Sequence, residues 1–197
     1  MRLEDIGAVF GVKAGTVIRT FSLKDGRWVI LRAPKWEDLD DLLEMINSLV
    51  DEKADIVRAE RVSRDDEIDW LSSVLRRVER DDVFFLLAEV GGRVVGSSEI
   101  GRSRGGYDSH VGGIGIAIKD GFRDAGLGTE MIKTLIAQAK SIGLKVLTLS
   151  AFATNKRAIH VYEKLGFVKT GTVPRKFLRQ GQYIDEAIMT LVLGEQR

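Results

Sequence analysis

An arginine and two glycines with the spacing Arg123-x-x-Gly126-x-Gly128 are the residues of this chain best suited to bind an anion. An apolar, mostly β-branched stretch at 111–118 precedes them, and apolar residues at helical spacing follow. Glycine lets backbone N–H groups approach a ligand closely, and the first turn of a helix has unpaired N–H donors. Together with the helix dipole and the cation of Arg123, this strand-turn-helix pattern predicts a pyrophosphate-binding turn.

The same turn lacks the signatures of two common nucleotide-binding loops. No Gly-Lys-Ser/Thr follows the glycines, which excludes a P-loop, and the Gly-x-Gly-x-x-Gly spacing of a dinucleotide-binding turn does not occur. Taken alone, the motif is equally typical of an ordinary turn between a strand and a helix. Its interpretation therefore depends on the rest of the chain.

A second group of residues follows a predicted buried strand at 144–152. It reads Asn155-Lys-Arg-Ala158-Ile-His-Val-Tyr162-Glu-Lys-Leu-Gly166-Phe167. With the two motifs in this order, the chain resembles the GNAT superfamily of acyl-CoA-dependent N-acyltransferases over roughly residues 28–193. The segment 175–189 also resembles a subgroup that includes amino-acid, antibiotic and ribosomal-protein acetyltransferases.

The resemblance implies a fold and a co-substrate. The expected fold class is α/β (α+β), with a single mixed, mostly antiparallel sheet, helices on both faces, and a splayed strand pair that holds CoA. In the family, acetyl-CoA (or CoA) is the co-substrate; its pantetheine arm lies between the splayed strands and pairs with backbone as an added strand would. The matching cofactor-binding positions are Ile116, Ala117, Ile118, Arg123, Asp124, Ala125, Gly126, Leu127, Gly128, Thr129, Asn155, Ala158 and Tyr162.

By the same resemblance, Tyr162 is the general acid that protonates the departing thiolate. The chemistry agrees, because a phenol with a pKa of ~10 is protonated at neutral pH, whereas a thiol has a pKa of ~8.5. The alternative is that Tyr162 packs with Ala158 and Leu165 on the buried face of its helix, with its hydroxyl hydrogen-bonded. The two roles are compatible, and we favour the acid.

The motifs do not indicate which group removes the proton from the attacking amine. A glutamate that serves this purpose in the subgroup would fall near Gly113, where this chain has no side chain. The candidate bases are Glu99 and His110, with Asp108, or a water molecule held by backbone carbonyls, as alternatives. His110 has the best intrinsic pKa, ~6.5, although a histidine at the edge of a loop is more often structural.

The elements that must position these residues follow in the order β-β-α-α-β-β-β-α-β-α-β-β, which favours one sheet flanked by helices. Asp25-Gly26 predicts a hairpin turn between the first two strands, and Ser63 with Asp66 predicts a helix N-cap. We expect an N-terminal extension at 1–27, containing the first hairpin strand, and an N-acetyltransferase domain at 28–197, together forming one compact unit. The predicted strands are 16–23, 28–32, 83–90, 93–100, 111–118, 144–152, 167–178 and 183–193.

Composition restricts the functions open to this chain of 197 residues. The absence of cysteine excludes disulfides, thiolate zinc sites and a cysteine nucleophile, and with only two histidines no metal is expected. A formal net charge of +1 argues against a nucleic-acid-binding surface. No apolar run is long enough to cross a membrane and no signal sequence is visible, so we expect a cytoplasmic protein.

The leading hypothesis is therefore an N-acetyltransferase in which an amine attacks acetyl-CoA directly. The expected partner is the amine acceptor, either a small molecule such as an amino acid or a protein α-amine or lysine. A homodimer is compatible with this interpretation. A non-catalytic acyl-CoA-binding module is the alternative, because position 113 carries no glutamate, and a nucleotide-binding α/β protein unrelated to acyl transfer is a third.

Overall fold

The computed structural model describes residues 11–102 and 105–194. Its strands are β1 (Val17–Ser22), β2 (Trp28–Arg32), β3 (Val83–Val90), β4 (Arg93–Arg102), β5 (Val111–Ile118), β6 (Val146–Phe152), β7 (Val168–Arg179) and β8 (Gln182–Val192). Its helices are α1 (Leu39–Asp51), α2 (Arg64–Glu79), α3 (Leu127–Ser141) and α4 (Lys156–Lys164), and a 3-10 turn, η2 (Trp36–Asp38), precedes α1.

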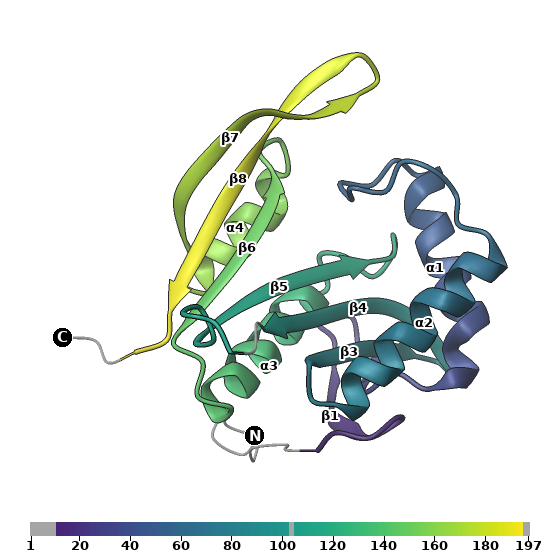
Figure 1. Ribbon diagram of the computed structural model, residues 1–197. Helices are drawn as coiled ribbons and strands as arrows, with labels where there is room; N and C mark the ends of the chain where they lie inside the picture. The colour runs from purple at the N-terminus through teal and green to yellow at the C-terminus, as the bar shows by residue number, and fades with distance from the viewer. Residues whose placement is uncertain (1–10, 103–104, 195–197) are drawn as a thin grey trace.

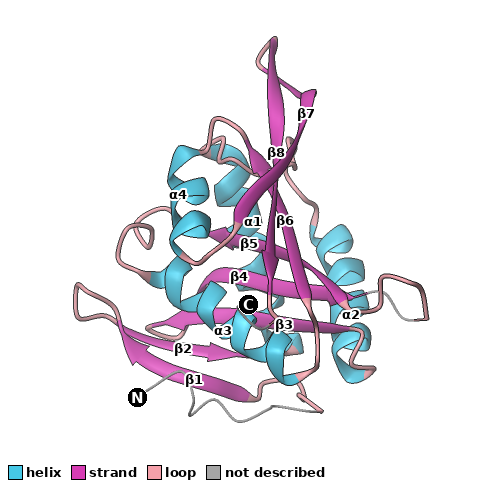
Figure 2. Cartoon of the chain, turned by 90° about the vertical axis from the view of Figure 1, so that its left-hand side faces the viewer, coloured by secondary structure: helices cyan, strands magenta, loops and turns pink. Residues whose placement is uncertain are grey.

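The strands form one eight-stranded sheet in the order β1-β2-β3-β4-β5-β6-β8-β7 (Figure 1). All neighbouring pairs are antiparallel except β5 and β6, which are parallel. The β7–β8 hairpin extends beyond the rest of the sheet (Figure 2). The predicted fold class, a mixed and mostly antiparallel sheet with helices, is confirmed.

Helices cover both faces of this sheet, and strand β3 shows how the sequence encodes the two layers. Phe85 and Leu87 pack in a cluster with residues of α1 and α2. Phe84 and Leu86 point to the other face and pack in a cluster with residues of α3 and α4. Because successive side chains of a strand alternate between faces, a continuous apolar strand such as β3 serves two cores.

The parallel pair β5 and β6 separates soon after it begins. The paired residues are Val111 with Val146, Gly112 with Leu147, and Gly113 with Thr148, and the pairing ends there. From that point the strands diverge, as Figure 1 shows, while β5 stays paired with β4 and β6 with β8. The facing edges of 114–118 and 149–152 are therefore left without strand partners.

The short-range predictions of turns and caps are also met. Gly26 adopts a φ of 86° in the β1–β2 turn, where a side chain would be strained. The Ser63 side chain accepts a hydrogen bond from the backbone of Asp66 at the start of α2. The strand expected from residue 144 begins at Val146, because Leu144 still donates to Ala139 at the end of α3.

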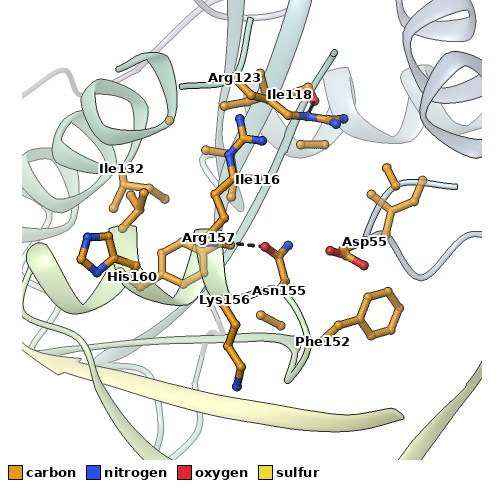
Figure 3. A pocket seen from close by; sticks show the side chains of 18 of the residues that line it. Asp55, Ile116, Ile118, Arg123, Ile132, Phe152, Asn155, Lys156, Arg157 and His160 are labelled. Carbon is orange, nitrogen blue, oxygen red and sulfur yellow. Dashed lines mark hydrogen bonds between the residues drawn. The ribbon is translucent and has the colours of Figure 1, made fainter. Parts of the chain in front are cut away.

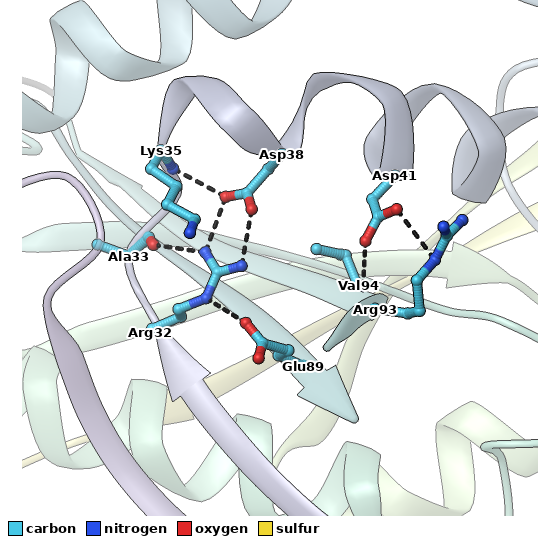
Figure 4. Close-up of polar contacts among 8 residues, drawn as sticks. All are labelled: Arg32, Ala33, Lys35, Asp38, Asp41, Glu89, Arg93 and Val94. Carbon is cyan, nitrogen blue, oxygen red and sulfur yellow. Dashed lines mark hydrogen bonds and ion pairs between the residues drawn. The ribbon is translucent and has the colours of Figure 1, made fainter. Parts of the chain in front are cut away.

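A buried ion-pair network connects the end of β2 to the residues at the start of α1 (Figure 4). The Arg32 side chain donates two hydrogen bonds of 2.7 Å to the carboxylate of Asp38 and one of 2.7 Å to Glu89. Asp38 also accepts from the backbone N–H of Lys35. Arg32 and Asp38 are only 6% and 4% exposed, so both charges depend on partners within the chain.

Residues 1–10 of the expected N-terminal extension lie outside the described residues. β1 is an edge strand of the common sheet and pairs with β2 across the expected boundary at 27/28. The division into 1–27 and 28–197 stays a prediction. None of the described helices is long and apolar enough to cross a membrane.

Candidate active site

A cleft of about 840 Å³ opens where β5 and β6 diverge. Its walls are the unpaired part of β5, the end of β6, the first turns of α3, one side of α4, and the loop that follows α1. Figure 3 shows Arg123 and Ile118 at one end of the cleft, Phe152 at the other, and Asp55 facing Asn155 across it. This volume is typical of a site for a cofactor-sized ligand.

The cleft collects almost the whole set of predicted cofactor-binding residues. Ala125 and Leu127 are the exceptions, because Leu127 is 1% exposed in the core and Ala125 packs beside it. The predicted residues that line the cleft are Ile116, Ala117, Ile118, Arg123, Asp124, Gly126, Gly128, Thr129, Asn155, Ala158 and Tyr162. Residues from three separate segments of the chain thus meet at the splay.

The two glycines of the phosphate turn, defined here as residues 121–129, have different structural tasks. Gly126 is the N-cap of α3 and has a φ of 95°, which a residue with a side chain adopts only under strain. Gly128 lets the helix approach the strand, since a Cβ there would lie 3.2 Å from the Cδ1 of Ile118. Only the first of the two therefore shapes the loop in front of the helix.

The cations of the phosphate turn are engaged by the chain itself. Arg123 donates from Nε to the carbonyl of Ile118 at 2.8 Å and forms an ion pair with Glu52. Arg157, in the first turn of α4, pairs with Asp124 at 2.7 Å. The sequence suggested Arg123 as a fixed cation for a phosphate, whereas its guanidinium connects the phosphate turn to the loop after α1.

Asn155 caps the helix that carries Tyr162. Its Oδ1 accepts a hydrogen bond of 3.0 Å from the backbone N–H of Ala158, as Figure 3 shows. This cap fixes the start of α4 at the wall of the cleft and stabilises a short helix. The described contacts of Asn155 are thus structural, and its contact with the cofactor stays a prediction.

Tyr162 lies at the boundary between the core and the cleft. Its ring packs edge-on against Phe167, with 6.1 Å between ring centroids, and the residue is 8% exposed. Burial raises the pKa of Tyr162 to about 12, because the charged phenolate is poorly solvated there. The hydroxyl therefore stays protonated throughout the neutral range, so packing and proton donation are both available to this residue.

A second cavity of about 440 Å³ lies at the same splay and contains Glu99. Glu99 is paired with Gly115 across the β4–β5 register, and its Oε1 lies 3.7 Å from the point where a Cβ on Gly115 would be. A Cβ on Gly113 would have only the carbonyl of Gly101 near it, at 4.0 Å. Gly113 and Gly115 thus leave open the space that the Glu99 carboxylate borders.

The two cavities have three lining residues in common, Ile114, Gly115 and Ser150. Glu99 shares the face of its strand partner Phe85, which packs with α1 and α2, whereas Tyr162 belongs to the cluster on the α3 and α4 face. A carboxylate and a phenol therefore approach one point of the splay from opposite faces of the sheet.

The other candidate bases lie elsewhere. His110 is exposed just before β5, at the end where β5 and β6 are still paired, and it lines neither of the two cavities. Asp108 is also exposed, and its carbonyl accepts from the backbone of Val111. Of the predicted bases, the structure brings only Glu99 to the splay.

Among the cleft residues outside the predicted cofactor-binding set are two groups that come from distant loops. The loop after α1 contributes residues 54–57, and Arg179 of β7 holds it through a 2.6 Å ion pair with Asp55 and a bond to the carbonyl of Lys53. Lys24 of the β1–β2 turn also lines the cleft. Neither group carries a motif, and no local signal in the sequence could have found them.

Comparisons with known proteins agree with this geometry. The Acetyltransferase (GNAT) family matches residues 40–167. The L-amino acid N-acetyltransferase AaaT of Escherichia coli (strain K12) is 30% identical over 118 residues, which cover 59% of this chain and 73% of that protein. The L-amino acid N-acyltransferase MnaT of the same strain is 27% identical over 168 residues, 84% of this chain and 95% of that protein.

A solved structure shares the fold. The phosphinothricin acetyltransferase (Pat) of Sinorhizobium meliloti, in complex with acetyl-CoA, superposes with a TM-score of 0.73 at 18% identity. The superposition covers 84% of this chain and 89% of that one. The likeness therefore extends over the sheet and the helices that carry the cleft.

Proposed function

This chain belongs to the acetyltransferase (GNAT) family, and on that premise we propose that it transfers the acetyl group of acetyl-CoA to a primary amine. One observation carries the proposal: the larger cleft and the Glu99 cavity meet at Ile114, Gly115 and Ser150. A thioester placed there can be reached from one face by an amine and from the other by an acid. An enzyme that joins two substrates needs such a meeting point.

The cleft fits the shape and the hydrogen-bonding needs of CoA. The free edges of 114–118 and 149–152 offer backbone donors and acceptors to the two amides of the pantetheine arm. The phosphate turn, with Gly126 at the N-cap of α3, offers backbone N–H groups to the pyrophosphate. Acetyl-CoA is the acyl donor because it is the donor in the family and is bound in the Sinorhizobium meliloti neighbour.

The reaction needs two proton movements, and one residue is available for each. The neutral amine nitrogen attacks the thioester carbonyl carbon, the C–N bond forms and the C–S bond breaks. Glu99 accepts the proton that the amine loses, and Tyr162 donates a proton to the departing sulfur, giving an N-acetyl product and free CoA. The phenol then regains its proton from solvent. Glu99 would take the place of the side chain that Gly113 lacks.

L-amino acids are the acceptors that we propose first. AaaT and MnaT are named for activity on L-amino acids, and MnaT matches most of this chain. Glu186 lines the Glu99 cavity as well, so two carboxylates are available to attract a cationic ammonium group. A protein α-amine or lysine is the other acceptor class, and the assay below includes both.

The test is an assay of CoA release with a thiol reagent, which this chain permits because it contains no cysteine. The acceptors are the L-amino acids, a peptide with a free N-terminus, a peptide with one lysine, and a no-acceptor control. We expect acceptor-dependent release with at least one L-amino acid. Acetyl-CoA binding without turnover for every acceptor would instead favour a non-catalytic binding module.

Two variants test the assigned residues. Tyr162→Phe should lower kcat about 100-fold and leave the affinity for CoA unchanged, because only proton donation is lost. Glu99→Gln should lower kcat/KM at neutral pH and recover as the pH approaches the pKa of the acceptor amine, since solvent then deprotonates the amine. His110→Gln is the matched control and should behave as wild type. Loss of activity in His110→Gln with none in Glu99→Gln would reverse the assignment of the base.

A further inference from the structure

The turn of the β1–β2 hairpin lies directly on the phosphate turn, although the two are distant in the sequence. The backbone N–H of Lys24 donates to the carbonyl of Ala125 at 3.2 Å, and Arg27 donates to the carbonyl of Gly121 at 2.9 Å. The guanidinium of Arg27 also lies 4.4 Å from the ring centre of Phe122. Backbone and side chain together therefore join the hairpin to the phosphate turn.

The hairpin turn is itself well fixed. Leu23 is 6% exposed and packs in the cluster that contains Leu127, the first residue of α3. Its backbone N–H donates to the carbonyl of Arg27 at 2.8 Å, and Asp25 accepts two hydrogen bonds from the Arg27 side chain. Lys24, which lies between these anchors, is therefore held at a defined position beside the cleft.

The side chain of Lys24 extends over Gly126. Its Cε and Cγ lie 3.8 and 4.0 Å from the point where a Cβ on Gly126 would be, and Lys24 lines the cleft. Lys24 is exposed, and no carboxylate among residues 11–102 and 105–194 pairs with its ammonium. A lysine stem packed on a backbone glycine directs its charge to the space in front of that backbone.

The other cations near the phosphate turn either pair with carboxylates of the chain or point away from the turn. Arg123 is bonded to Ile118 and Glu52, and Arg157 to Asp124. Lys156 also lines the cleft, but Figure 3 shows its side chain directed away from Arg123 and the phosphate turn. In the described part of the chain, Lys24 is thus the cation that reaches this turn without a carboxylate partner.

We propose that Lys24 binds the pyrophosphate of CoA and that the β1–β2 hairpin is part of the cofactor site. The inference rests on the proposed function, since it requires CoA in the cleft. It adds a charged group to the neutral backbone donors in front of α3, where a fixed cation strengthens binding of a doubly charged diphosphate. The hairpin lies outside residues 40–167, so this contribution does not come from the part of the chain that matches the family.

The experiment measures the affinities of CoA and 3′-dephospho-CoA by titration calorimetry for wild type, Lys24→Ala and Lys140→Ala. Lys140 is an exposed lysine near the other end of α3, so its variant removes the same charge away from the cleft. Lys24→Ala should weaken both ligands about five-fold, the range of an exposed ion pair, and the loss should shrink at high salt. Lys140→Ala should bind both ligands as wild type does.

Comparing the two ligands shows whether Lys24 contacts the pyrophosphate or the 3′-phosphate of CoA. If Lys24→Ala loses the same affinity for CoA and for 3′-dephospho-CoA, Lys24 contacts the pyrophosphate, which both ligands contain. If only the affinity for CoA falls, Lys24 contacts the 3′-phosphate, and the proposal is overturned. Wild-type affinity in Lys24→Ala, with an unchanged thermal unfolding curve, would also overturn it and leave the proposed function intact. If wild type binds neither ligand, the proposed function itself fails, and the two failures are therefore separable.

Discussion

The ion pairs around Arg32 and those around the phosphate turn use the same kinds of residue for different purposes. Arg32 is 6% exposed, and its guanidinium forms ion pairs with Asp38 and Glu89. The side chains of Arg123 and Glu52 are 27% and 26% exposed. A buried charge needs all its partners from the chain, whereas a partly exposed pair is weak and can exchange partners at little cost. The first group therefore holds the fold, and the second remains available to a ligand.

The largest effect that this comparison predicts is on stability. Asp38→Ala would leave the guanidinium of Arg32 buried with half of its carboxylate partners, which should lower the free energy of unfolding by about 3 kcal/mol. Denaturant unfolding measures the loss, and titration of the folded variant with CoA should give the wild-type affinity. Asp40→Ala, in the first turn of α1 and paired with Arg64 at the surface, is the control and should unfold as wild type does. Equal losses in the two variants would show that burial does not distinguish the pairs.

The next effect concerns the phosphate turn. Gly126→Ala places a side chain on a residue with a φ of 95° and should shift the loop that presents the backbone donors. We expect the affinity for CoA to fall about ten-fold, equivalent to about 1.4 kcal/mol. Gly128→Ala is the matched variant, because its Cβ would meet only the ends of the Ile118 and Ile116 side chains, which can shift, and it should bind CoA nearly as wild type does. The reverse order of the two affinities would contradict the roles assigned to the two glycines.

The sequence predicted the parts of this site that rest on local pattern. The strand at 111–118, the turn with Gly126 and the helix carrying Tyr162 are each encoded within one segment by apolar periodicity and glycine. Their placement on one splayed sheet followed from the resemblance to the family, and β5 and β6 do separate, beyond the pair Gly113 and Thr148. Pattern and family together were sufficient for the fold and for most of the cleft.

The remaining features depend on contacts between distant loops, which no local pattern encodes. Glu99 borders the space above Gly115 because of the register of two strands joined by a long loop. Arg123 is paired with Glu52 of the loop after α1, and Lys24 is brought to the phosphate turn by the β1–β2 hairpin. These contacts join segments that are distant in the sequence, so they form only when the whole chain has folded. For that reason the sequence did not reveal that Arg123 pairs with Glu52.

A smaller effect should follow from releasing Arg123. Glu52→Gln removes the carboxylate that pairs with this guanidinium and also removes a negative charge near the phosphate turn. The affinity for CoA should therefore rise about three-fold at low salt, and the gain should disappear at high salt. Glu60→Gln, an exposed position in the same loop, removes an equal charge and controls for long-range attraction. An affinity that falls in Glu52→Gln would mean that the ion pair positions Arg123 for the ligand.

The smallest effect concerns Glu67, a buried carboxylate whose burial is only partly compensated by a nearby opposite charge. Glu67 of α2 is 5% exposed, and burial raises its pKa while the charge of Arg58 only partly opposes the shift. A raised pKa means that the ionised side chain is less favourable in the folded chain than in the unfolded chain, so its cost is present above the ordinary pKa of ~4.3 and absent well below it. Glu67→Gln should accordingly increase the free energy of unfolding at pH 7 by less than about 1 kcal/mol, and the gain should vanish near pH 3. Denaturant unfolding at the two pH values measures the difference. A Gln variant that is less stable at pH 7 would show that Glu67, like Asp38, is held by partners that compensate its burial.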